Sequence, residues 1–367
     1  MVKSIMSGVK SIWGKVIMVG RGIVNYDGKD ARRAVMEWSG HFIKALSNDN
    51  VKVAKHSVRK VGEEDGKPKY ELRLKISSAC IRHSLFEPDQ PFHNPAILHA
   101  PKILLRWISS VAGLLRGYMF EAKGCVGIKR KSPVFITDAE QVNGTIPTFD
   151  IGVQCAPKTE KEDAEDASGL TMHFKEAICE VVYEFDFAID LNLLQFISLS
   201  QRYDRLAVDP NYEPEYRKNL EQTLGSSVTP KGWYIYKTAT NGLPEEGILL
   251  TQEQVVTLVQ EFFQRLLGLC IQRGGGGYAK VQSVQVKHVS NPLTDLADDA
   301  PTYQVRTVED LRLKPADVEV FYNRVSDEEA VALYSDLDEA EKIQKARAKE
   351  QKAEEKERKA AKKAAKG

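Results

Sequence analysis

Apolar residues recur at two different spacings along this chain, and the order of the two patterns restricts its fold more than any other feature. Helical spacing, with apolar side chains three and four residues apart, runs over 97–119 and over 251–267. Alternating spacing, typical of half-buried strands, runs over 9–24, 181–193 and 278–289. The resulting order is strand, helix, strands, helix, strand. It predicts an α+β fold with a modified RRM-like, or ferredoxin-like, antiparallel sheet and two main helices.

Two local signals place further boundaries. Two more alternating segments predict an inserted β-hairpin over 51–77, because they flank GEEDGKP, which supplies a glycine, an Asp-Gly pair and a proline for a polar turn. The second helical pattern has a defined start, because Thr251 with Gln254 three residues later forms a capping box. Both signals support the predicted mixture of strands and helices.

The remaining segments divide the chain into a main body and two C-terminal parts. The body is expected to span 1–289 and to include an irregular insertion region over 126–250, with an acidic linker at 157–169. An extension follows over 290–338. Lysine, arginine, glutamate and alanine dominate 339–367, with opposite charges four residues apart, which predicts a charged tail that is helical or disordered.

The composition excludes several classes of protein. Lys and Arg (52) almost balance Asp and Glu (51), so a surface that binds a polyanion must arise from local clustering of charge. The five cysteines are far apart and odd in number, which favours reduced thiols. No run of about eighteen apolar residues occurs, and lysines interrupt the apolar N-terminal segment. We therefore expect a cytoplasmic protein that does not contact a membrane.

The stretch IQRGGGGYAKV places four consecutive glycines between the second helical pattern and the last strand. They are Gly274, Gly275, Gly276 and Gly277. A helix C-cap with a flexible turn would need only one glycine. Four glycines allow a bound backbone to approach closely and to meet several N–H groups, with Arg273 and Lys280 for charge and Tyr278 for stacking. Both interpretations remain open from the sequence, whereas a nucleotide P-loop fits poorly because GxxxxGK[ST] is absent.

Basic residues gather near predicted loops and turns despite the neutral total charge. They are Arg21, Arg82 with His83, Arg116, the run Lys129, Arg130 and Lys131, and the pair Arg202 and Arg205. A solvated charged face explains any one such cluster. Their recurrence beside a predicted sheet favours a groove that follows a phosphate backbone.

Motifs for metal binding or covalent catalysis are weak or absent. Cys80 and His83 have the spacing of a half-site, but no second half-site follows. Neither GxSxG nor HExxH occurs. Asp27 and Asp30 in NYDGKD could hold a metal ion or a ribose hydroxyl, although turn formation explains them more simply. We predict no catalytic residue, no bound metal and no cofactor.

The order of several short motifs resembles that of the backbone subunit of class 1 CRISPR effector complexes, in the repeat-associated RAMP superfamily. The motifs are VGRGIVNYDG, CIRHSLFE, AGLLRGYMF with KRKSPVFITD, LQFISLSQRYDRLAV, and GILLTQ with the glycine run before YAKVQSVQV. The resemblance covers roughly 9–289 and is greatest to subunits of type IV and of the minimal type I-F variant systems.

The resemblance implies a modified RRM fold that carries a thumb hairpin, with several copies coating one guide RNA. The hairpin 51–77 would be the inserted finger or thumb. Residues at or near the RNA would be Arg21, Arg82, His83, Arg116, the patch Lys129 to Lys131, Arg202, Arg205 and the loop Gly274 to Gly277. The chain departs from the RRM pattern because the aromatic stacking signature is absent, and residues 290–367 have no recognisable counterpart.

The predicted function is that of a non-catalytic, multi-copy subunit that binds CRISPR RNA along its length and presents it to a target DNA strand. Its partners would be the RNA, further copies of itself and other effector subunits. Two alternatives stay open. A type III-like subunit would cut target RNA through an aspartate after the first strand, where Asp27 and Asp30 lie. A general single-strand RNA-binding protein would act without a guide.

Overall fold

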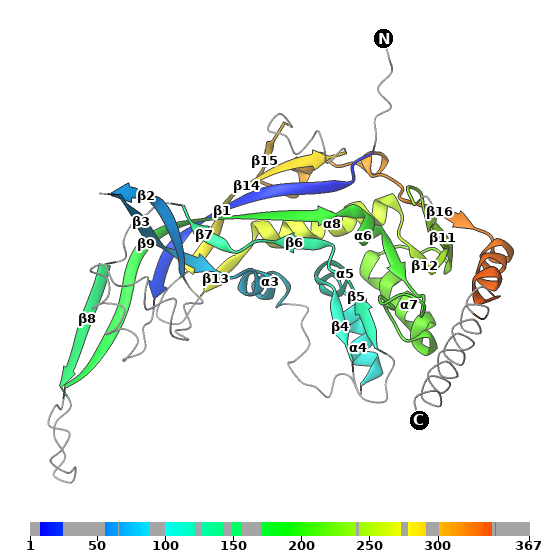
Figure 1. Cartoon of the computed structure of the whole chain (residues 1–367), viewed down its shortest axis with the longest axis horizontal. Helices are drawn as coiled ribbons and strands as arrows, with labels where there is room; N and C mark the ends of the chain where they lie inside the picture. Colours follow the sequence, from blue (N-terminus) through cyan, green and yellow to red (C-terminus); the bar gives the residue numbers. More distant parts are fainter. Residues whose placement is uncertain are drawn as a thin grey trace, which may run out of the picture.

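A computed structural model gives the fold of the chain. It describes residues 8–24, 56–64, 66–87, 100–121, 127–142, 148–155, 170–239, 242–272, 278–290, 301–339 and 342. The molecule is elongated, with a long twisted sheet along its length, two hairpins at one end and a helical lobe at the other (Figure 1).

A large antiparallel sheet forms the body. Its main path runs β13 (Cys270–Gln272), β14 (Tyr278–Val289), β1 (Ser11–Val24), β9 (Leu170–Asp190), β7 (Ala139–Gln141), β3 (Lys67–Ile76) and β2 (His56–Glu64). Three further strands pair at its sides, namely β15 (Tyr303–Val305) with β14, and both β6 (Val134–Ile136) and β8 (Thr148–Cys155) with β9. The predicted strands over 9–24 and 278–289 are therefore present as β1 and β14, and the one over 181–193 is present as the second half of β9, which ends at Asp190 where helix α6 (Leu191–Gln195) begins. Strand β1 lies between the other two.

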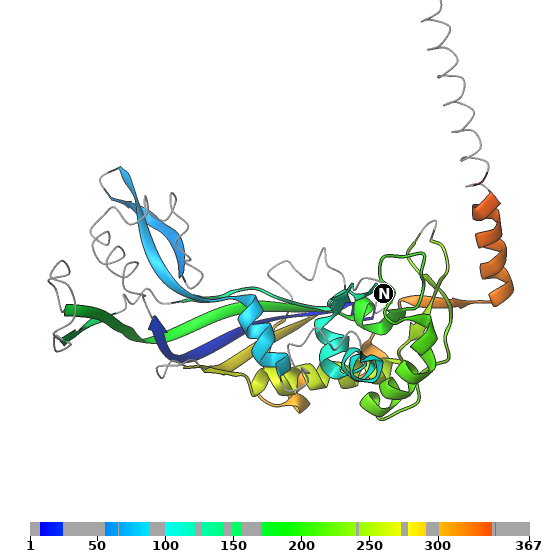
Figure 2. The same cartoon turned by 90° about the horizontal axis from the view of Figure 1, so that it is seen from below.

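Helices cover one face of this sheet, as Figure 2 shows. The longest is α8 (Gln252–Leu267), and its predicted capping box is confirmed, since Thr251 and Gln254 bond to each other's backbone. The apolar side of α8 packs under β9, where the Phe187 ring lies 5.4 Å from Phe262 and 5.6 Å from Phe263. Shorter helices α3 (Ser78–Phe86) and α5 (Val111–Arg116) lie beside it. Among the described residues, no helix has the length and apolar character needed to cross a bilayer.

The prediction of one continuous helix over 97–119 is wrong. The segment forms α4 (Pro101–Ile108) and α5, with a break at Ser109 and Ser110. The Ser109 hydroxyl donates to the Leu105 carbonyl at 2.7 Å, and the Ser110 hydroxyl accepts from the Gly113 N–H at 3.2 Å, which starts the next helix. Hydroxyl groups thus end one helix and cap the other.

The inserted segments contain more β-strands than we predict from the sequence. The hairpin within 51–77 is confirmed as β2 paired with β3, and it projects from one end of the sheet (Figure 1). Strand β8 pairs with the first half of β9 to form a second projecting hairpin. Residues 126–170 were expected to be irregular, yet they contain β5 (Ile128–Arg130), β6, β7 and β8. The acidic linker at 157–169 lies outside the described residues.

A second sheet builds the lobe at the other end. Its order is β10 (Phe196–Ser198), β12 (Glu245–Leu249), β11 (Gly232–Tyr236) and β16 (Tyr322–Val325). Helices α6 (Leu191–Gln195) and α7 (Glu213–Leu224) complete the lobe, and β4 (Tyr118–Phe120) pairs with β5 nearby. The extension 290–338 supplies β15, β16 and buried side chains such as Leu311, Val318 and Phe321. It is therefore part of one continuous core, and it ends in a helix over 327–339.

Candidate nucleic-acid interface

The basic residues singled out in the sequence fall into three groups, and the first lies where α3 and α5 meet the loop before β6. Arg82 of α3 donates to the Ser132 hydroxyl at 3.2 Å and to the Val134 carbonyl at 2.7 Å. Burial, and after it the positive charge of Arg116, lowers the pKa of Arg82 below its ordinary value. The two guanidinium groups of Arg82 and Arg116 repel each other, and a bound anion such as a phosphate would offset that repulsion. His83 follows on the same helix and is half-buried.

Arg130 is not a surface residue, and the expectation that it meets phosphate is wrong. Only 6% of it is exposed, because it lies on the inward side of β5. Its guanidinium donates to four main-chain carbonyls, those of Leu114 at 3.3 Å, Leu193 at 3.2 Å, Leu194 at 3.3 Å and Phe196 at 3.0 Å. Arg130 therefore links α5, α6 and β10 through hydrogen bonds, and its role is structural.

The two lysines beside Arg130 face outward, as expected. Lys129 forms an ion pair with Asp204 at 2.6 Å, and Lys131 is exposed. Of the predicted run of three cations, Lys131 and Lys129 are thus available at the surface, next to the group formed by Arg82 and Arg116.

The second group lies on the loop over 199–208. Arg205 forms a two-point ion pair with Glu245, whose side chain is only 5% exposed, and the Nε to Oε1 distance is 2.8 Å. Burial alone would lower the pKa of Arg205, but the hydrogen bond and charge of Glu245 raise it overall. Arg202 is about half exposed and pairs with Asp338 of the helix over 327–339, at 3.1 and 3.3 Å.

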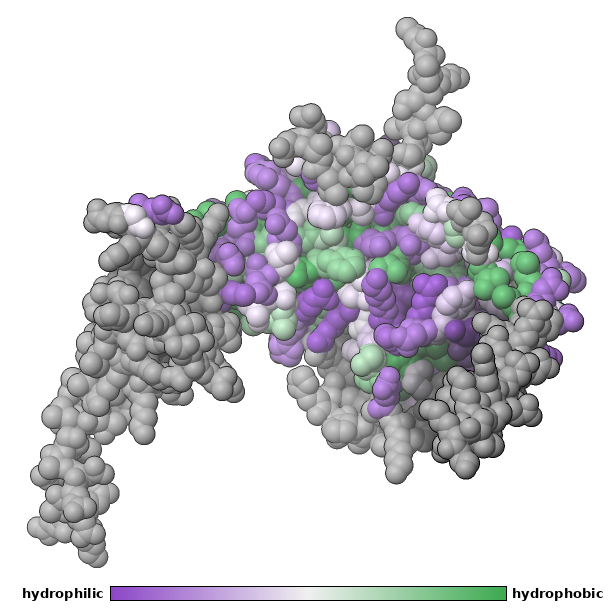
Figure 3. Space-filling model, viewed as in Figure 1, coloured by the Kyte–Doolittle hydropathy of each residue, from purple (hydrophilic) through white to green (hydrophobic). Residues whose placement is uncertain are grey.

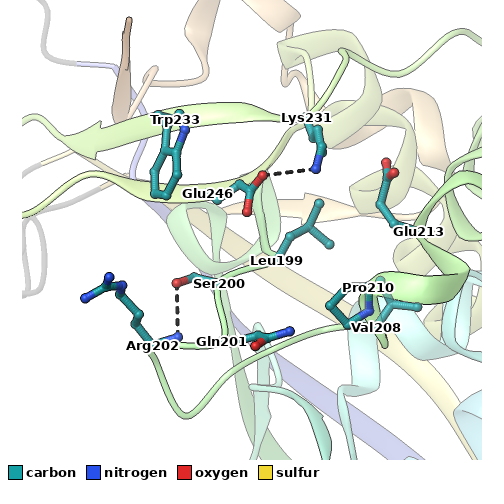
Figure 4. A pocket seen from close by; sticks show the side chains of 10 residues that line it. All are labelled: Leu199, Ser200, Gln201, Arg202, Val208, Pro210, Glu213, Lys231, Trp233 and Glu246. Carbon is teal, nitrogen blue, oxygen red and sulfur yellow. Dashed lines mark hydrogen bonds and ion pairs between the residues drawn. The ribbon is translucent and has the colours of Figure 1, made fainter. Parts of the chain in front are cut away.

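A cavity of about 320 Å³ opens beside this loop (Figure 4). Its floor is apolar, with Leu199, Val208 and Pro210, and the indole of Trp233 forms a wall. Its polar lining includes Arg202 and Lys231 together with Glu213 and Glu246, and Lys231 pairs with Glu246 at 3.1 Å. Such a lining can hold a flat ring and an anionic group together.

The third group lies at the hairpin end of the sheet. Tyr278 is 49% exposed, Lys280 is exposed, and the backbone of Arg21 pairs with that of Tyr278. The side chain of Arg21 is not described. Arg273 and the glycines 274–277 lie outside the described residues. Their flanks are described, and Gln272 pairs with Tyr278 across β13 and β14.

The position of the glycine run differs from the expected one. Helix α8 ends at Leu267 with Gly268 as its C-cap, and β13 follows before the glycines. The run therefore connects two paired strands, and the interpretation of the four glycines as a helix C-cap is wrong.

Sequence reasoning missed several side chains with the right chemistry. Trp13 and Phe135 are 39% and 44% exposed on the sheet face opposite α8, in register with Ala188 between them. The view in Figure 3 shows apolar side chains gathered in the middle of the molecule among hydrophilic ones. Trp233 and Tyr334 were also missed. The alternation in GWYIY could have indicated a half-buried Trp233, whereas no local signal points to Tyr334.

The described residues offer no metal centre: among them, no group of three or more His, Cys, Asp and Glu side chains could hold an ion. Asp27 and Asp30 lie outside the described residues, so the structure does not bear on them.

Comparisons with known proteins place the chain in a family. The model of the type I-Fv CRISPR-associated protein Cas7fv-like family matches residues 8–296. No curated protein matches. Among solved structures, the chain is similar to one of a CRISPR RNA-guided surveillance complex, at 10% identity and a TM-score of 0.33, covering 75% of this chain and 68% of that one. It is also similar to one of such a complex in a pre-nicking state, at 12% identity and a TM-score of 0.27, covering 75% and 77%.

Both structural likenesses are too distant to add to the family match. That match spans both hairpins, the central sheet except β15, and α8, which is most of the chain. The chain belongs to the type I-Fv Cas7fv-like family of CRISPR-associated proteins.

Proposed function

We propose that the protein is a non-catalytic backbone subunit that binds CRISPR RNA along its length, in several copies, and presents it for pairing with target DNA. The observation that carries this proposal is the family match over residues 8–296. Base pairing would supply the sequence specificity, while the protein would contact the RNA backbone and its shape.

The strand order supports a modified RRM-like palm. In space the strands run β14, β1, β9 and then β6 or β7, all antiparallel, with helices before β6 and between β9 and β14 in the chain. This is the order that a β-α-β-β-α-β unit produces. The β2–β3 hairpin then occupies the place of an inserted finger or thumb.

The charge distribution supports contacts to the RNA backbone at separate points. Arg82, Arg116 and Lys131 form one cationic site, and Tyr278 with Lys280 forms another at the hairpin end of the sheet. The whole chain has a net charge of only +1, so these local groups must supply the attraction.

Sequencing of RNA that copurifies with the protein tests this proposal. Coexpressed with a repeat-spacer array, the protein should retain RNAs of uniform length that carry the array's guide sequences. A matched preparation with Arg116→Ala and Lys131→Ala should retain less RNA, because two phosphate contacts are lost. Retention of RNAs of mixed length and origin would favour the general single-strand binding protein instead.

We also propose that the protein does not cut RNA. The type III-like alternative places catalysis on Asp27 or Asp30, so the decisive sample is the assembled protein with guide RNA and a complementary labelled RNA. With Mg²⁺ present, the labelled strand should remain intact over hours. Cleavage that disappears in Asp27→Ala or Asp30→Ala would establish the alternative.

A further inference from the structure

The helix over 327–339 follows the region matched by the family and carries charge of one sign. Its charged residues are Asp327, Glu328, Glu329, Asp336, Asp338 and Glu339, with no lysine or arginine among them. The helix, orange in Figure 1, lies at the lobe end beside β11 and β16. It therefore brings a strongly acidic surface next to the loop over 199–208, which carries Arg202 and Arg205.

Two side chains fix the helix to the lobe. Tyr334 is buried and its hydroxyl donates to the Pro244 carbonyl, while its ring lies 5.4 Å from the Trp233 ring. Burial raises the pKa of Tyr334 to about 12, so the hydroxyl stays protonated and remains a donor. One turn later, Asp338 accepts two hydrogen bonds from Arg202, and the Arg202 guanidinium lies 4.3 Å from the centre of the Tyr334 ring.

The groups that these two side chains contact also line the 320 Å³ cavity. Arg202 and Trp233 are part of its wall, and Lys231, which pairs with Glu246 at 3.1 Å, adds a second cation (Figure 4). An aromatic ring and a carboxylate four residues apart on a helix lie on the same side of it. Tyr334 and Asp338 thus offer Trp233 and Arg202 a flat ring and an anion, which are the two groups that a nucleotide offers as base and phosphate.

We propose that Trp233, Arg202 and Lys231 form a binding site for one nucleotide of single-stranded RNA, and that the Asp338 carboxylate takes the place of the RNA phosphate at Arg202 in the protein without RNA. The inference rests on the proposed function, since it assumes that RNA reaches this lobe. The RNA phosphate would replace the Asp338 carboxylate at Arg202, and the base would stack on Trp233 beside the cavity.

The exposure of the ion pair makes this exchange feasible. The side chains of Arg202 and Asp338 are 50% and 48% exposed, and ion pairs so exposed add little to stability. The ion pair of Arg205 differs, because the side chain of its partner Glu245 is almost fully buried and belongs to the same lobe. Arg202 is therefore the cation of this loop that can exchange its partner on the acidic helix for an RNA phosphate.

The test measures the affinity of RNA-free, full-length protein for a labelled oligouridylate about twelve nucleotides long. Asp338→Asn releases Arg202 and should tighten binding about threefold, and it should steepen the dependence of log K on log salt by about 0.7. Asp336→Asn is the matched control, because it removes the same charge from an exposed position of the same helix. It should change the affinity by much less.

A double variant separates release of Arg202 from a general loss of negative charge. Arg202→Ala should weaken binding, and adding Asp338→Asn to it should then give no further gain. Equal affinities for Asp338→Asn and Asp336→Asn, or weaker binding by Asp338→Asn, would overturn the inference. If neither the native protein nor any variant binds RNA, the proposed function fails as well. Thermal midpoints of all variants identify any loss of folding, and Asp338→Asn should stay within a few degrees of the native protein.

Discussion

Replacing Arg130 with alanine is expected to lower the free energy of unfolding by about 3 to 5 kcal/mol, because several buried carbonyls lose their donor and a large buried side chain is removed. The guanidinium is the common donor to the carbonyls of Leu114, Leu193, Leu194 and Phe196. Alanine would leave these carbonyls buried without that donor, and it would open a cavity between α5, α6 and β10. Urea unfolding of the purified protein measures the effect.

Two variants, one at the neighbouring Lys131 and one at Arg130 itself, provide the controls. Lys131→Ala removes the same charge from an exposed position and should change the unfolding free energy by no more than about 0.5 kcal/mol. Arg130→Lys keeps the charge but loses the planar fork of donors, so it should recover only part of the stability. If Arg130→Ala proves as stable as Lys131→Ala, the hydrogen bonds of Arg130 do not stabilise the packing of α5, α6 and β10.

The burial of Arg130 shows why its position could not be predicted from the sequence. Three adjacent cations suggest a solvated or phosphate-binding patch, yet the middle one lies inside. Strand β5 alternates, so Ile128 and Arg130 share its inward face while Lys129 points outward. The alternation was present in the sequence. The short strand was not recognised because three residues are too few to establish a period.

The main strands and α8 could be predicted because their patterns are long and their ends have local signals. Alternation over β1 and β14, and the capping box of α8, needed no knowledge of distant residues. The break between α4 and α5 could not be predicted by periodicity, since the apolar spacing continues across Ser109 and Ser110. There the serine side chains compete with the helix for its backbone groups.

Contacts between remote parts of the chain were beyond sequence reasoning. Arg202 and Asp338 are 136 residues apart, and only the fold brings them together. The same holds for the extension 290–338, whose β16 pairs with β11 and whose Leu311 and Phe321 enter the core. Without such pairings, Arg202 and Arg205 look alike in QRYDR. The structure distinguishes them, because Arg205 pairs with the buried carboxylate of Glu245 in its own lobe, whereas Arg202 pairs with Asp338 of the acidic helix.

The glycine run remains the strongest candidate for close approach to RNA. Replacing Gly275 and Gly276 together with alanine should leave thermal stability nearly unchanged, because the run connects β13 and β14 beyond their last pair, Gln272 with Tyr278. Assembly along a guide-length RNA should weaken by about tenfold. Each added Cβ would intrude between the backbone and the RNA and remove easy access to positive φ. Loss of one charge-assisted hydrogen bond, about 1.5 kcal/mol, accounts for that factor.

Mass photometry of protein copies on the RNA measures this assembly, and Gly268→Ala supplies the matched control. Gly268 lies on the preceding connection, between α8 and β13, and a Cβ there would meet its nearest atom, the Gln264 carbonyl oxygen, at an ordinary 3.5 Å. That variant should fold and assemble normally. Arg273→Ala should show a milder defect than the double variant, because it removes charge but no backbone contact. If the double variant assembles as fully as Gly268→Ala, the glycines are only a flexible connection. The phosphate contacts would then come from the described cationic sites, of which Arg82, Arg116 and Lys131, where α3 and α5 meet, form the largest group.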